Sequence, residues 1–393
     1  MISVAEAKKI IQQHSTTFTP VITPLSTATG LVLAAAVYAG NNFPPFAQSA
    51  MDGYAFRFAD WQAEHNLLIS NESAAGNTER ILLADNQAVR IFTGAPVPDG
   101  ADTVIMQEKT ATKDGQLLIL DKKIQKGSNV RLEGSEIETG SLAMPKGGLL
   151  SAAAIGFLAG IGKTELLVYP KPSIAIIATG KELQKPGMPL QYGQVYESNT
   201  YTLSAALQQM HITNISIAWA DDDLAIIETA LQNAFATSDI VLITGGVSVG
   251  DYDFVATALA NCGVEKLLHK IKQRPGKPLY VGKKEDRLVF GLPGNPSSVL
   301  TCFYEYVLPS IQKFMGKQHV GLIVNRLPLA VAYTKPAGLT HFLKGIVAGN
   351  EVMPLTGQES YRLHSFALAN CLVVLEEEAT EYAKGDLVEV HLF

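Results

Sequence analysis

The sequence of 393 residues lacks the marks of several large protein classes. It has three cysteines, Cys262, Cys302 and Cys371, and none belongs to a C-x-x-C pair. Neither a disulfide framework nor a zinc site is therefore indicated. We expect these cysteines to be buried apolar side chains in a reducing cytosol. Basic residues are not in excess, because the net charge is -6, and this argues against a general nucleic-acid binder.

Long apolar runs are also missing. The longest, Gly30 to Ala39, is too short to span a bilayer, and the first residues lack the apolar core of a signal peptide. Hydrophobic residues make up 47% and charged residues 17% of the chain, a balance typical of packed globular proteins. We expect a soluble cytoplasmic protein that binds neither nucleic acid nor membrane. Its length predicts two to four domains.

The segment from residue 170 to 318 predicts an α/β domain. Short apolar runs typical of buried strands alternate with longer helical patterns, and this alternation predicts a doubly wound, mostly parallel sheet. The predicted strands are Ser173–Gly180, Ile215–Trp219, Asp239–Thr244 and Arg287–Leu292. The predicted helices are Asn199–Met210, Leu224–Ala236, Phe254–Asn261 and Pro296–Phe314.

Polar and glycine-rich loops follow each predicted strand, and in such sheets ligands bind at the carboxyl ends of the strands. The third strand leads into Gly245, Gly246, Ser248, Gly250, Asp251 and Asp253. An ordinary strand-to-helix turn with an aspartate N-cap would explain this loop alone. However, the other strands end in a similar manner, in Thr179 to Leu183 with Glu182, in Asp221 to Asp223, and in Pro293, Gly294, Asn295 and Pro296.

Positive charge is supplied by one further loop, which contains Arg274 and Lys277. None of the loops has the spacing of a P-loop or of a dinucleotide-binding fingerprint. Carboxylates, glycine amides and two cations together favour a phosphorylated ligand held by Mg²⁺. Since Mg²⁺ usually takes one or two carboxylates with water and phosphate, some of the acidic residues should be helix caps.

The regions on either side predict smaller domains. Residues 1–36 and 139–169 are interpreted as a discontinuous N-terminal helical linker and dimer domain, and a helix is expected at Thr27 to Ala36. Residues 37–138 show short alternating runs that predict an inserted β-rich domain. Residues 319–393 predict a small C-terminal β domain with Arg326, Lys344, Arg362 and Ser365 as candidate polar contacts.

Several motifs in one order resemble the molybdopterin molybdenumtransferase (MoeA) family, which is similar to the E domain of gephyrin. These motifs are Ser49 to Ala55 (SAMDGYA), Thr93 to Pro96 (TGAP), Gly100 to Glu108 (GADTVIMQE), Thr179 to Leu183 (TGKEL), Thr244 to Gly250 (TGGVSVG), Pro275 to Pro278 (PGKP) and Gly291 to Ser298 (GLPGNPSS).

The resemblance implies a Mg²⁺-dependent transferase that inserts molybdate into adenylyl-molybdopterin and releases AMP. It also implies a homodimer in which the small domains of one subunit close over the large domain of the other. On matching positions, Glu182, Asp221 and Asp253 would hold the metal, and Lys277 would neutralise charge on molybdate and phosphate together with Arg274, which replaces a lysine. Asp52 and Thr93 would close the site from the β insertion. The substrate-binding residues would be Gly245, Gly246, Ser248, Gly250, Pro293, Gly294, Asn295, Pro296 and Ser365.

Four positions depart from the family pattern. Glu136 stands where aspartate is common, Lys181 where aspartate is usual, Arg274 where lysine is usual, and Glu359 where a Gly-Ser pair is typical. The additional methylene moves the Glu136 carboxylate by roughly 1.5 Å. Arginine at position 274 keeps the charge but gives a forked, less mobile donor.

Two other functions fit the same residues. A non-enzymatic scaffold would bind and deliver molybdopterin without turnover, and a related α/β phosphohydrolase would cleave dinucleotides. An adenylyltransferase and molybdoenzymes are the candidate protein partners. The sequence leaves open whether molybdate or tungstate is the oxyanion.

Overall fold

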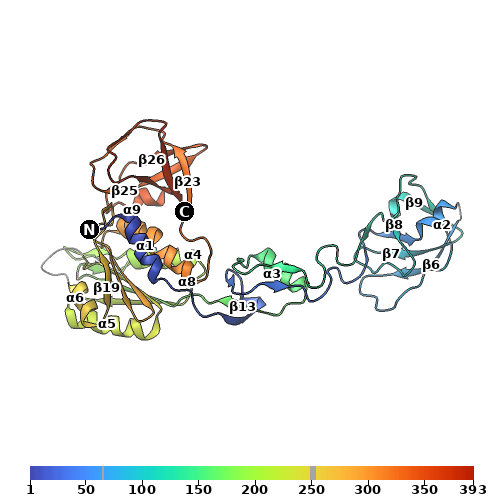
Figure 1. Cartoon of the computed structure of the whole chain (residues 1–393), viewed down its shortest axis with the longest axis horizontal. Helices are drawn as coiled ribbons and strands as arrows, with labels where there is room; N and C mark the ends of the chain where they lie inside the picture. The colour runs from blue at the N-terminus through green and yellow to red at the C-terminus, as the bar shows by residue number, and fades with distance from the viewer. Residues whose placement is uncertain (64–65, 248–253) are drawn as a thin grey trace. The chain divides into compact units, whose positions relative to one another are not determined.

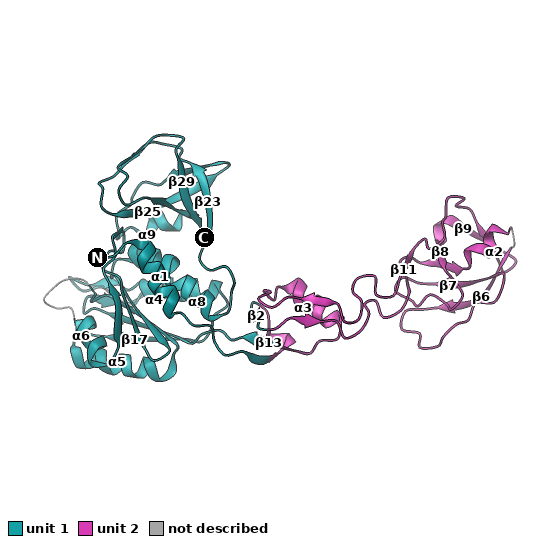
Figure 2. Cartoon of the chain, in the orientation of Figure 1, with its two compact units in different colours: residues 1–22, 30–34, 167–393 teal, residues 23–29, 35–166 magenta. Residues whose placement is uncertain are grey.

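The fold is seen in a computed structural model that describes residues 1–63, 66–247 and 254–393. The chain forms two compact units (Figure 2). Unit 1 contains residues 1–22, 30–34 and 167–393, and unit 2 contains residues 23–29 and 35–166. Within the described residues, no helix has the length and apolar character needed to cross a membrane. The division into four domains stays a prediction.

A six-stranded sheet forms the centre of unit 1 (Figure 1), in the order β17-β14-β18-β22-β21-β19. The first four strands are parallel: β17 (Ile215–Ala220), β14 (Ile174–Thr179), β18 (Ile240–Thr244) and β22 (Arg287–Leu292). The last two pair antiparallel: β21 (Tyr280–Lys284) and β19 (Glu265–His269). The predicted mostly parallel sheet is confirmed.

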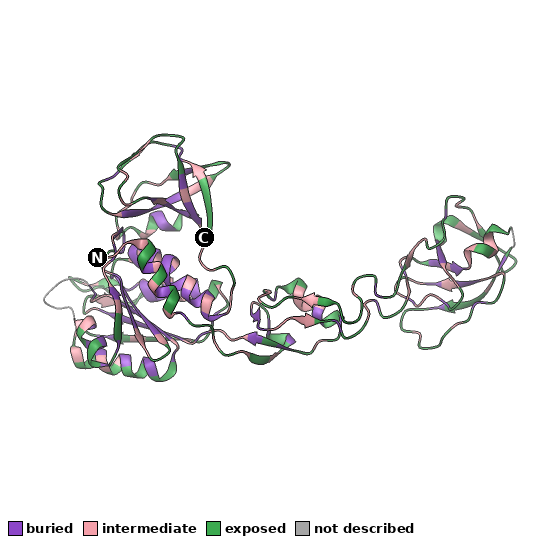
Figure 3. Ribbon diagram, in the orientation of Figure 1, coloured by how far each residue is buried: buried purple, intermediate pink, exposed green. Residues whose placement is uncertain are grey.

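Alternation of side chains along the strands gives the sheet a core on each face. On β18, Ile240 and Leu242 belong to one cluster of buried side chains, and Val241 and Ile243 belong to the other. In Figure 3 the strands of this sheet are drawn largely in purple, the colour of buried residues. The covering helices are α4 (Asn199–Gln209) and α7 (Pro296–Cys302) on the first face, and α5 (Leu224–Thr237) and α6 (Phe254–Asn261) on the second.

The N-terminal helix α1 (Val4–His14) packs into the first of these cores through Ala7 and Ile11. Its N-cap residue is Ser3, whose hydroxyl accepts a hydrogen bond from the amide of Glu6 at 3.2 Å. After α7 the chain continues through a π-helical turn, Phe303–Val307, into α8 (Leu308–Phe314). The predicted helix from Pro296 to Phe314 is therefore continuous, with the π turn inside it.

The predicted C-terminal β domain is confirmed as part of unit 1. Its main sheet has the order β20-β25-β27-β29-β23, with β26 paired to β25. The strands are β20 (Gln273–Arg274), β23 (Ile323–Pro328), β25 (Thr340–Ala348), β26 (Glu351–Pro354), β27 (Cys371–Leu375) and β29 (Leu387–Leu392). The short strands β24 (Tyr333–Thr334) and β28 (Glu381–Tyr382) form a separate pair, and helix α9 spans Leu363–Ala367.

Unit 2 contains the predicted β insertion, a sheet of order β8-β5-β7-β6-β10-β9. Its strands are β5 (Gly53–Phe56), β6 (Leu67–Ser73), β7 (Gln87–Ile91), β8 (Thr103–Met106), β9 (Thr110–Lys113) and β10 (Gln116–Ile119). The other elements are β3 (Val37–Tyr38), β4 (Gln48–Ser49), α2 (Phe58–Gln62), β11 (Val130–Arg131), β12 (Leu142–Met144) and α3 (Ala152–Gly160).

The prediction of a helix from Thr27 to Ala36 is wrong. Gly30 has a positive φ of +77°, which lies outside helical geometry. Val32 and Leu33 instead form the buried strand β2 (Val32–Leu33), which pairs with β13 (Glu165–Tyr169). The run of small apolar residues fits a buried strand as well as a helix, and the distant partner β13 decides between them. Strand β1 (Val21–Pro24) completes this three-stranded sheet.

Candidate functional site

The carboxyl ends of the four parallel strands lie at one edge of the sheet. The register pairs Thr179 with Ala220 and Thr244 with Leu292, all of them the last residues of their strands. The loops that begin at Gly180, Asp221, Gly245 and Pro293 therefore leave the sheet at the same edge. This is the place where doubly wound sheets bind ligands.

Gly245 and Gly246, at the start of the loop after β18, pack closely against neighbouring residues. Both have positive φ, +88° at Gly245 and +61° at Gly246. A Cβ atom at Gly245 would lie 2.7 Å from the carbonyl oxygen of Thr179, and one at Gly246 would lie 2.6 Å from Val255. The Thr179 hydroxyl also donates to the carbonyl of Thr244 at 3.0 Å. Packing within the protein thus already requires glycine at both positions, independently of a ligand.

Replacing Gly245 by alanine is expected to lower the free energy of unfolding by about 3 kcal/mol. A left-handed backbone costs an L-residue about 1–2 kcal/mol, and a clash in a packed region adds about 1–3 kcal/mol. Gly187 is a matched control, because it has the same φ of +88° but no atom within 4 Å of its would-be Cβ. Urea denaturation of both variants checks the difference, and equal losses would contradict the packing argument.

Two predicted metal ligands follow the neighbouring strands β14 and β17. Glu182 is exposed and its carboxylate lies over Gly180, where a Cβ would be 2.7 Å from one carboxylate oxygen. In the aspartate triplet, Asp223 caps α5 by accepting hydrogen bonds from Ala225 and Ile226 at 3.0 and 3.1 Å. Asp221 is exposed and its side chain has no hydrogen-bond partner within the described part of the chain. The geometry thus separates a cap from a carboxylate that is available to a ligand.

The third predicted metal ligand, Asp253, lies outside the described residues, as do Ser248, Gly250 and Asp251. In residues 1–63, 66–247 and 254–393, no group of three or more His, Cys, Asp or Glu is arranged to hold a metal ion. Glu182 and Asp221 are exposed carboxylates in the loops after β14 and β17, and carboxylate oxygens are the hard ligands that Mg²⁺ takes together with water and phosphate.

The two predicted cations lie on a turn that packs against α7. Arg274 and Lys277 are exposed, and neither forms an ion pair with a carboxylate in the described residues. Between them, a Cβ at Gly276 would lie 2.6 Å from Cys302 of α7. The buried side chain of Gln273 donates to the carbonyl of Pro275 at 2.9 Å. The turn is fixed by its packing, and its two positive side chains remain free to meet an anion.

The segment Pro293 to Ser297, which follows β22, is held from two sides. The side-chain amide of Asn199, at the start of α4, donates to the carbonyl of Gly294 at 2.9 Å. Ser360 of the C-terminal β domain accepts hydrogen bonds from the Asn295 side chain at 2.9 Å and from the Ser297 amide at 3.0 Å. Sequence reasoning missed Asn199 and Ser360. A polar residue opening a predicted helix was the available signal for Asn199, whereas Ser360 had none.

Asp52 and Thr93, predicted to act together, are in direct contact in unit 2. One carboxylate oxygen of Asp52 accepts hydrogen bonds from the Thr93 amide at 2.8 Å and the Thr93 hydroxyl at 2.7 Å. These bonds, and the charge of Arg90, hold the pKa of Asp52 below its ordinary value although burial opposes the shift. Asp52 is therefore an exposed, ionised carboxylate at neutral pH. Its role at the substrate stays a prediction, as does that of Glu136.

Ser365, a predicted substrate contact in the C-terminal β domain, is 7% exposed. Its hydroxyl is near two carbonyls, those of Gly357 at 2.7 Å and Arg362 at 3.1 Å. A hydroxyl has one hydrogen to donate, so the donor of Ser365 is already used inside the loop. Only its acceptor capacity remains for a ligand.

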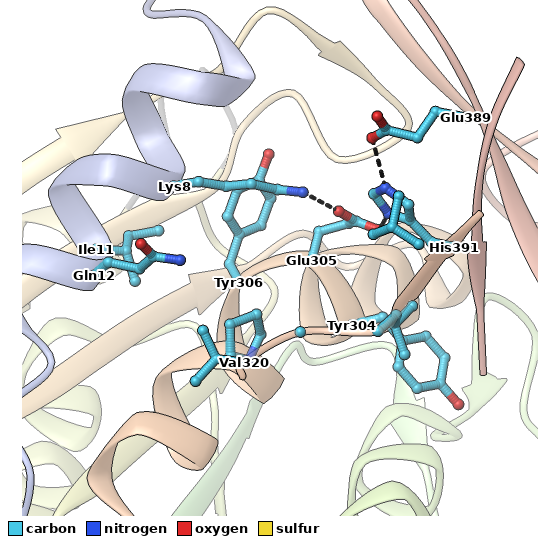
Figure 4. A pocket seen from close by; sticks show the side chains of 13 residues that line it. Lys8, Ile11, Gln12, Tyr304, Glu305, Tyr306, Val320, Glu389 and His391 are labelled. Carbon is cyan, nitrogen blue, oxygen red and sulfur yellow. Dashed lines mark hydrogen bonds and ion pairs between the residues drawn. The ribbon is translucent and has the colours of Figure 1, made fainter. Parts of the chain in front are cut away.

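A separate pocket of about 230 Å³ contains charged side chains but shares no residue with the predicted site. Figure 4 shows Lys8, Glu305, His391 and Glu389 linked through hydrogen bonds and ion pairs. Their charges are paired with one another, so they are satisfied without a ligand. We interpret this cluster as a structural link between α1, the π turn and β29.

Most of the α/β domain matches a known family. Residues 175–313, which include the sheet and its strand-end loops, match a family described as a probable molybdopterin binding domain. Residues 2–162 match the MoeA N-terminal region, domains I and II, and residues 326–393 match the MoeA C-terminal region, domain IV. The fold and the strand-end loops thus define a multidomain protein of molybdenum cofactor biosynthesis.

Proteins that are similar to this chain over nearly its whole length identify the particular family. A molybdopterin molybdenumtransferase of Haemophilus influenzae is 33% identical and covers 94% of this chain and 93% of its own. Molybdopterin molybdenumtransferase 2 of Mycobacterium tuberculosis is 32% identical over 99% of both chains. The solved molybdopterin biosynthesis MoeA protein of Pyrococcus horikoshii superposes with a TM-score of 0.81 at 26% identity, covering both chains entirely. The chain belongs to the molybdopterin molybdenumtransferase (MoeA) family.

Proposed function

We propose that this protein inserts molybdate into adenylyl-molybdopterin and releases AMP, yielding the molybdenum cofactor. The observation that carries the proposal is the match to this transferase family along the whole chain, from residue 2 to residue 393. The sheet edge supports it, because the exposed carboxylates Glu182 and Asp221 follow neighbouring strands at the edge where doubly wound sheets bind ligands.

Each predicted residue has a role that follows from its chemistry. Glu182 and Asp221, with Asp253, would hold a Mg²⁺ ion, which supplies charge neutralisation at the phosphates. Arg274 and Lys277 would stabilise the negative charge of molybdate and of the departing AMP. Gly245, Gly246 and the segment from Pro293 to Pro296 would shape the floor of the site. Asp52 and Thr93 would present a carboxylate and a hydroxyl to the substrate from the β insertion.

The proposal extends to assembly and location. A homodimer, with the site shared between subunits, is supported by the family resemblance, as is a cytoplasmic location. The adenylyltransferase that supplies the substrate and the enzymes that receive the cofactor are its proposed protein partners. Sedimentation velocity of the full chain would test the dimer directly.

The activity is tested with purified protein, adenylyl-molybdopterin, molybdate and Mg²⁺. We expect AMP release that depends on molybdate and stops when EDTA removes the metal. Tight binding of the substrate without AMP release would favour the alternative function, a scaffold that binds and delivers molybdopterin. Hydrolysis of simple dinucleotides without molybdate would favour the phosphohydrolase. Replacing molybdate by tungstate in the same assay identifies the preferred oxyanion.

A further inference from the structure

Lys344, on β25 of the C-terminal β domain, is a buried lysine whose partners are carbonyl groups. The residue is 2% exposed. Its ammonium group donates to the carbonyls of Gly357 at 2.8 Å, Glu359 at 3.3 Å and Arg362 at 3.1 Å. An ammonium group has three N–H donors, so three carbonyls satisfy it completely. A buried charge needs such complete satisfaction.

The loop formed by residues 357–362, here called the Lys344 loop, is closed around this side chain. Gln358 accepts a hydrogen bond from the Lys344 amide at 3.0 Å and donates to the Lys344 carbonyl at 2.9 Å. Glu359 and Arg362 form an ion pair at 2.9 Å across the loop. The conformation of the loop thus depends on one buried cation and on the residues next to it.

The Lys344 loop carries Ser360, which reaches the predicted substrate site. Ser360 accepts from the Asn295 side chain and from the Ser297 amide, as described above. On the opposite side of this segment, Asn199 holds the carbonyl of Gly294. The conformation of Asn295 to Ser297 is therefore coupled to the Lys344 loop through two hydrogen bonds.

We propose that Lys344 is a positioning residue for the substrate site. Its ammonium group fixes the Lys344 loop, and Ser360 of that loop fixes the segment Asn295 to Ser297, which binds the substrate. The C-terminal β domain thereby sets the geometry of a substrate-binding segment in the α/β domain. The inference rests on the proposed function for the identity of the substrate, but the coupling itself is a property of the fold.

The coupling depends on the charge of Lys344. A neutral amine has two N–H donors and turns a lone pair toward the third carbonyl. Burial lowers the pKa of Lys344 to about 8, which the charge of Glu359 opposes and the charge of Arg362 reinforces. Across the sheet, β27 places the apolar Leu372 beside Lys344. The next strand, β29, contributes His391, whose ring is paired with Glu305 and Glu389. Helix α9 adds one titratable side chain, His364. Lys344 is hence charged at neutral pH and loses its charge in mildly alkaline solution.

The experiment measures hydrogen exchange at the Ser297 amide and steady-state kinetics in parallel. The variants are Lys344→Met, which removes the charge, Lys344→Arg, which keeps it at alkaline pH, and Ser360→Ala, which removes the acceptor for Asn295. Lys335→Met is a matched control for the amide measurement. Lys335 is also buried, at 4% exposure, and also donates to three carbonyls, those of Pro336, Leu339 and Glu377.

We expect Lys344→Met to reduce the protection factor of the Ser297 amide about tenfold, while Lys335→Met leaves it unchanged. Wild-type protection should fall between pH 7 and pH 9.5, and Lys344→Arg should remove that fall. Ser360→Ala should raise KM for adenylyl-molybdopterin about tenfold, the effect of losing the one hydrogen bond between the Asn295 side chain and the Ser360 hydroxyl, with a smaller change in kcat.

Unchanged Ser297 protection in Lys344→Met, or an equal loss in Lys335→Met, would overturn the coupling. An unchanged KM in Ser360→Ala would overturn the role of Ser360 at the substrate. If wild-type protein releases no AMP, the proposed function fails, whereas the amide measurement still decides whether Lys344 positions the segment.

Discussion

Replacing Glu305 by glutamine is expected to lower the free energy of unfolding of unit 1 by about 3 kcal/mol. Removing one partner of a buried ion pair costs about 3–5 kcal/mol, because the remaining charge is left uncompensated. The lower end applies here because Lys8 has a side chain that is 33% exposed and can turn to solvent. His391 can also release its proton.

The buried position of Glu305 explains the size of the effect. Its side chain is 2% exposed and lies in the π turn, between a helix and a strand from opposite ends of the chain (Figure 4). Its carboxylate accepts hydrogen bonds from Lys8 of α1 at 2.5 Å and from His391 of β29 at 2.7 Å. On its other ring nitrogen, His391 contacts Glu389 at 2.8 Å. One carboxylate therefore joins three elements of unit 1.

The loss of unfolding free energy in Glu305→Gln should depend on pH in a defined direction. Burial raises the pKa of Glu305, but His391 and Lys8 outweigh it and bring the pKa below the ordinary 4.5. Burial lowers the pKa of His391, but Glu305 outweighs it and brings the pKa above the ordinary 6.5. The contribution of Glu305 is present above pH 4.5 and is lost as the pH falls through its folded pKa. The contribution of His391 is present below pH 6.5 and is lost as the pH rises through its folded pKa.

The difference between wild type and Glu305→Gln should therefore be largest between pH 4.5 and pH 6.5 and smaller at pH 9. Urea denaturation at pH 5.5 and pH 9 measures it. Glu285→Gln is the control, because Glu285 pairs with Arg287 at 2.7 Å with 72% of its side chain exposed. Such an exposed pair contributes less than about 1 kcal/mol. A difference that does not change with pH would contradict the ionic role of the cluster.

The sequence predicts the parallel sheet and the loops at its edge because both depend on local patterns. Runs such as Ile240 to Ile243 are apolar at every position, and a strand that is buried on both faces of a sheet requires apolar side chains at every position. Since parallel strands end at one edge, the sequence alone places the acidic and glycine-rich loops at a common edge. The resemblance to a family then selected Asp52 and Thr93, which prove to be hydrogen-bonded to each other.

What the sequence does not predict are polar contacts between distant segments. Lys8 and Glu305 are 297 residues apart, and Asn295 and Ser360 are 65 residues apart. The sequence around a lysine or serine looks the same whether or not a distant segment of the folded chain provides a hydrogen-bond partner for its side chain. The wrong prediction of a helix at Thr27 to Ala36 has the same cause, since pairing with the distant strand β13 decides the conformation of this segment. Buried Lys344 could be named as a polar candidate, but its three carbonyl partners depend on tertiary folding.

Changing Asp221 to asparagine is expected to lower kcat/KM for AMP release by about 100-fold. Removing one group that stabilises charge in a transition state typically costs about 100- to 1,000-fold. Asp221 follows β17 at the same edge as Glu182 after β14, and its carboxylate has no hydrogen-bond partner among the described residues. Asparagine keeps the size of the side chain but removes the negative charge with which a carboxylate ligand attracts Mg²⁺.

Asp223→Asn is the matched control, since the two positions are separated by one residue and the charge change is identical. Asp223 caps α5 through two backbone amides, and asparagine caps helices about as well as aspartate. We therefore expect its activity and its stability to stay near wild type. Asp223→Ala, in contrast, should cost about 1 kcal/mol of stability through the lost cap.

A titration of the AMP-release assay with Mg²⁺ would separate a ligand role of Asp221 from a general electrostatic one. If Asp221 holds the metal, Asp221→Asn should need a higher Mg²⁺ concentration for half-maximal AMP release, and added Mg²⁺ should restore part of the rate. If the residue only adds negative charge to the site, the rate should fall equally at every Mg²⁺ concentration. Equal losses in Asp221→Asn and Asp223→Asn would show that the net charge of the triplet matters, and the assignment of Asp221 as a ligand would then be wrong.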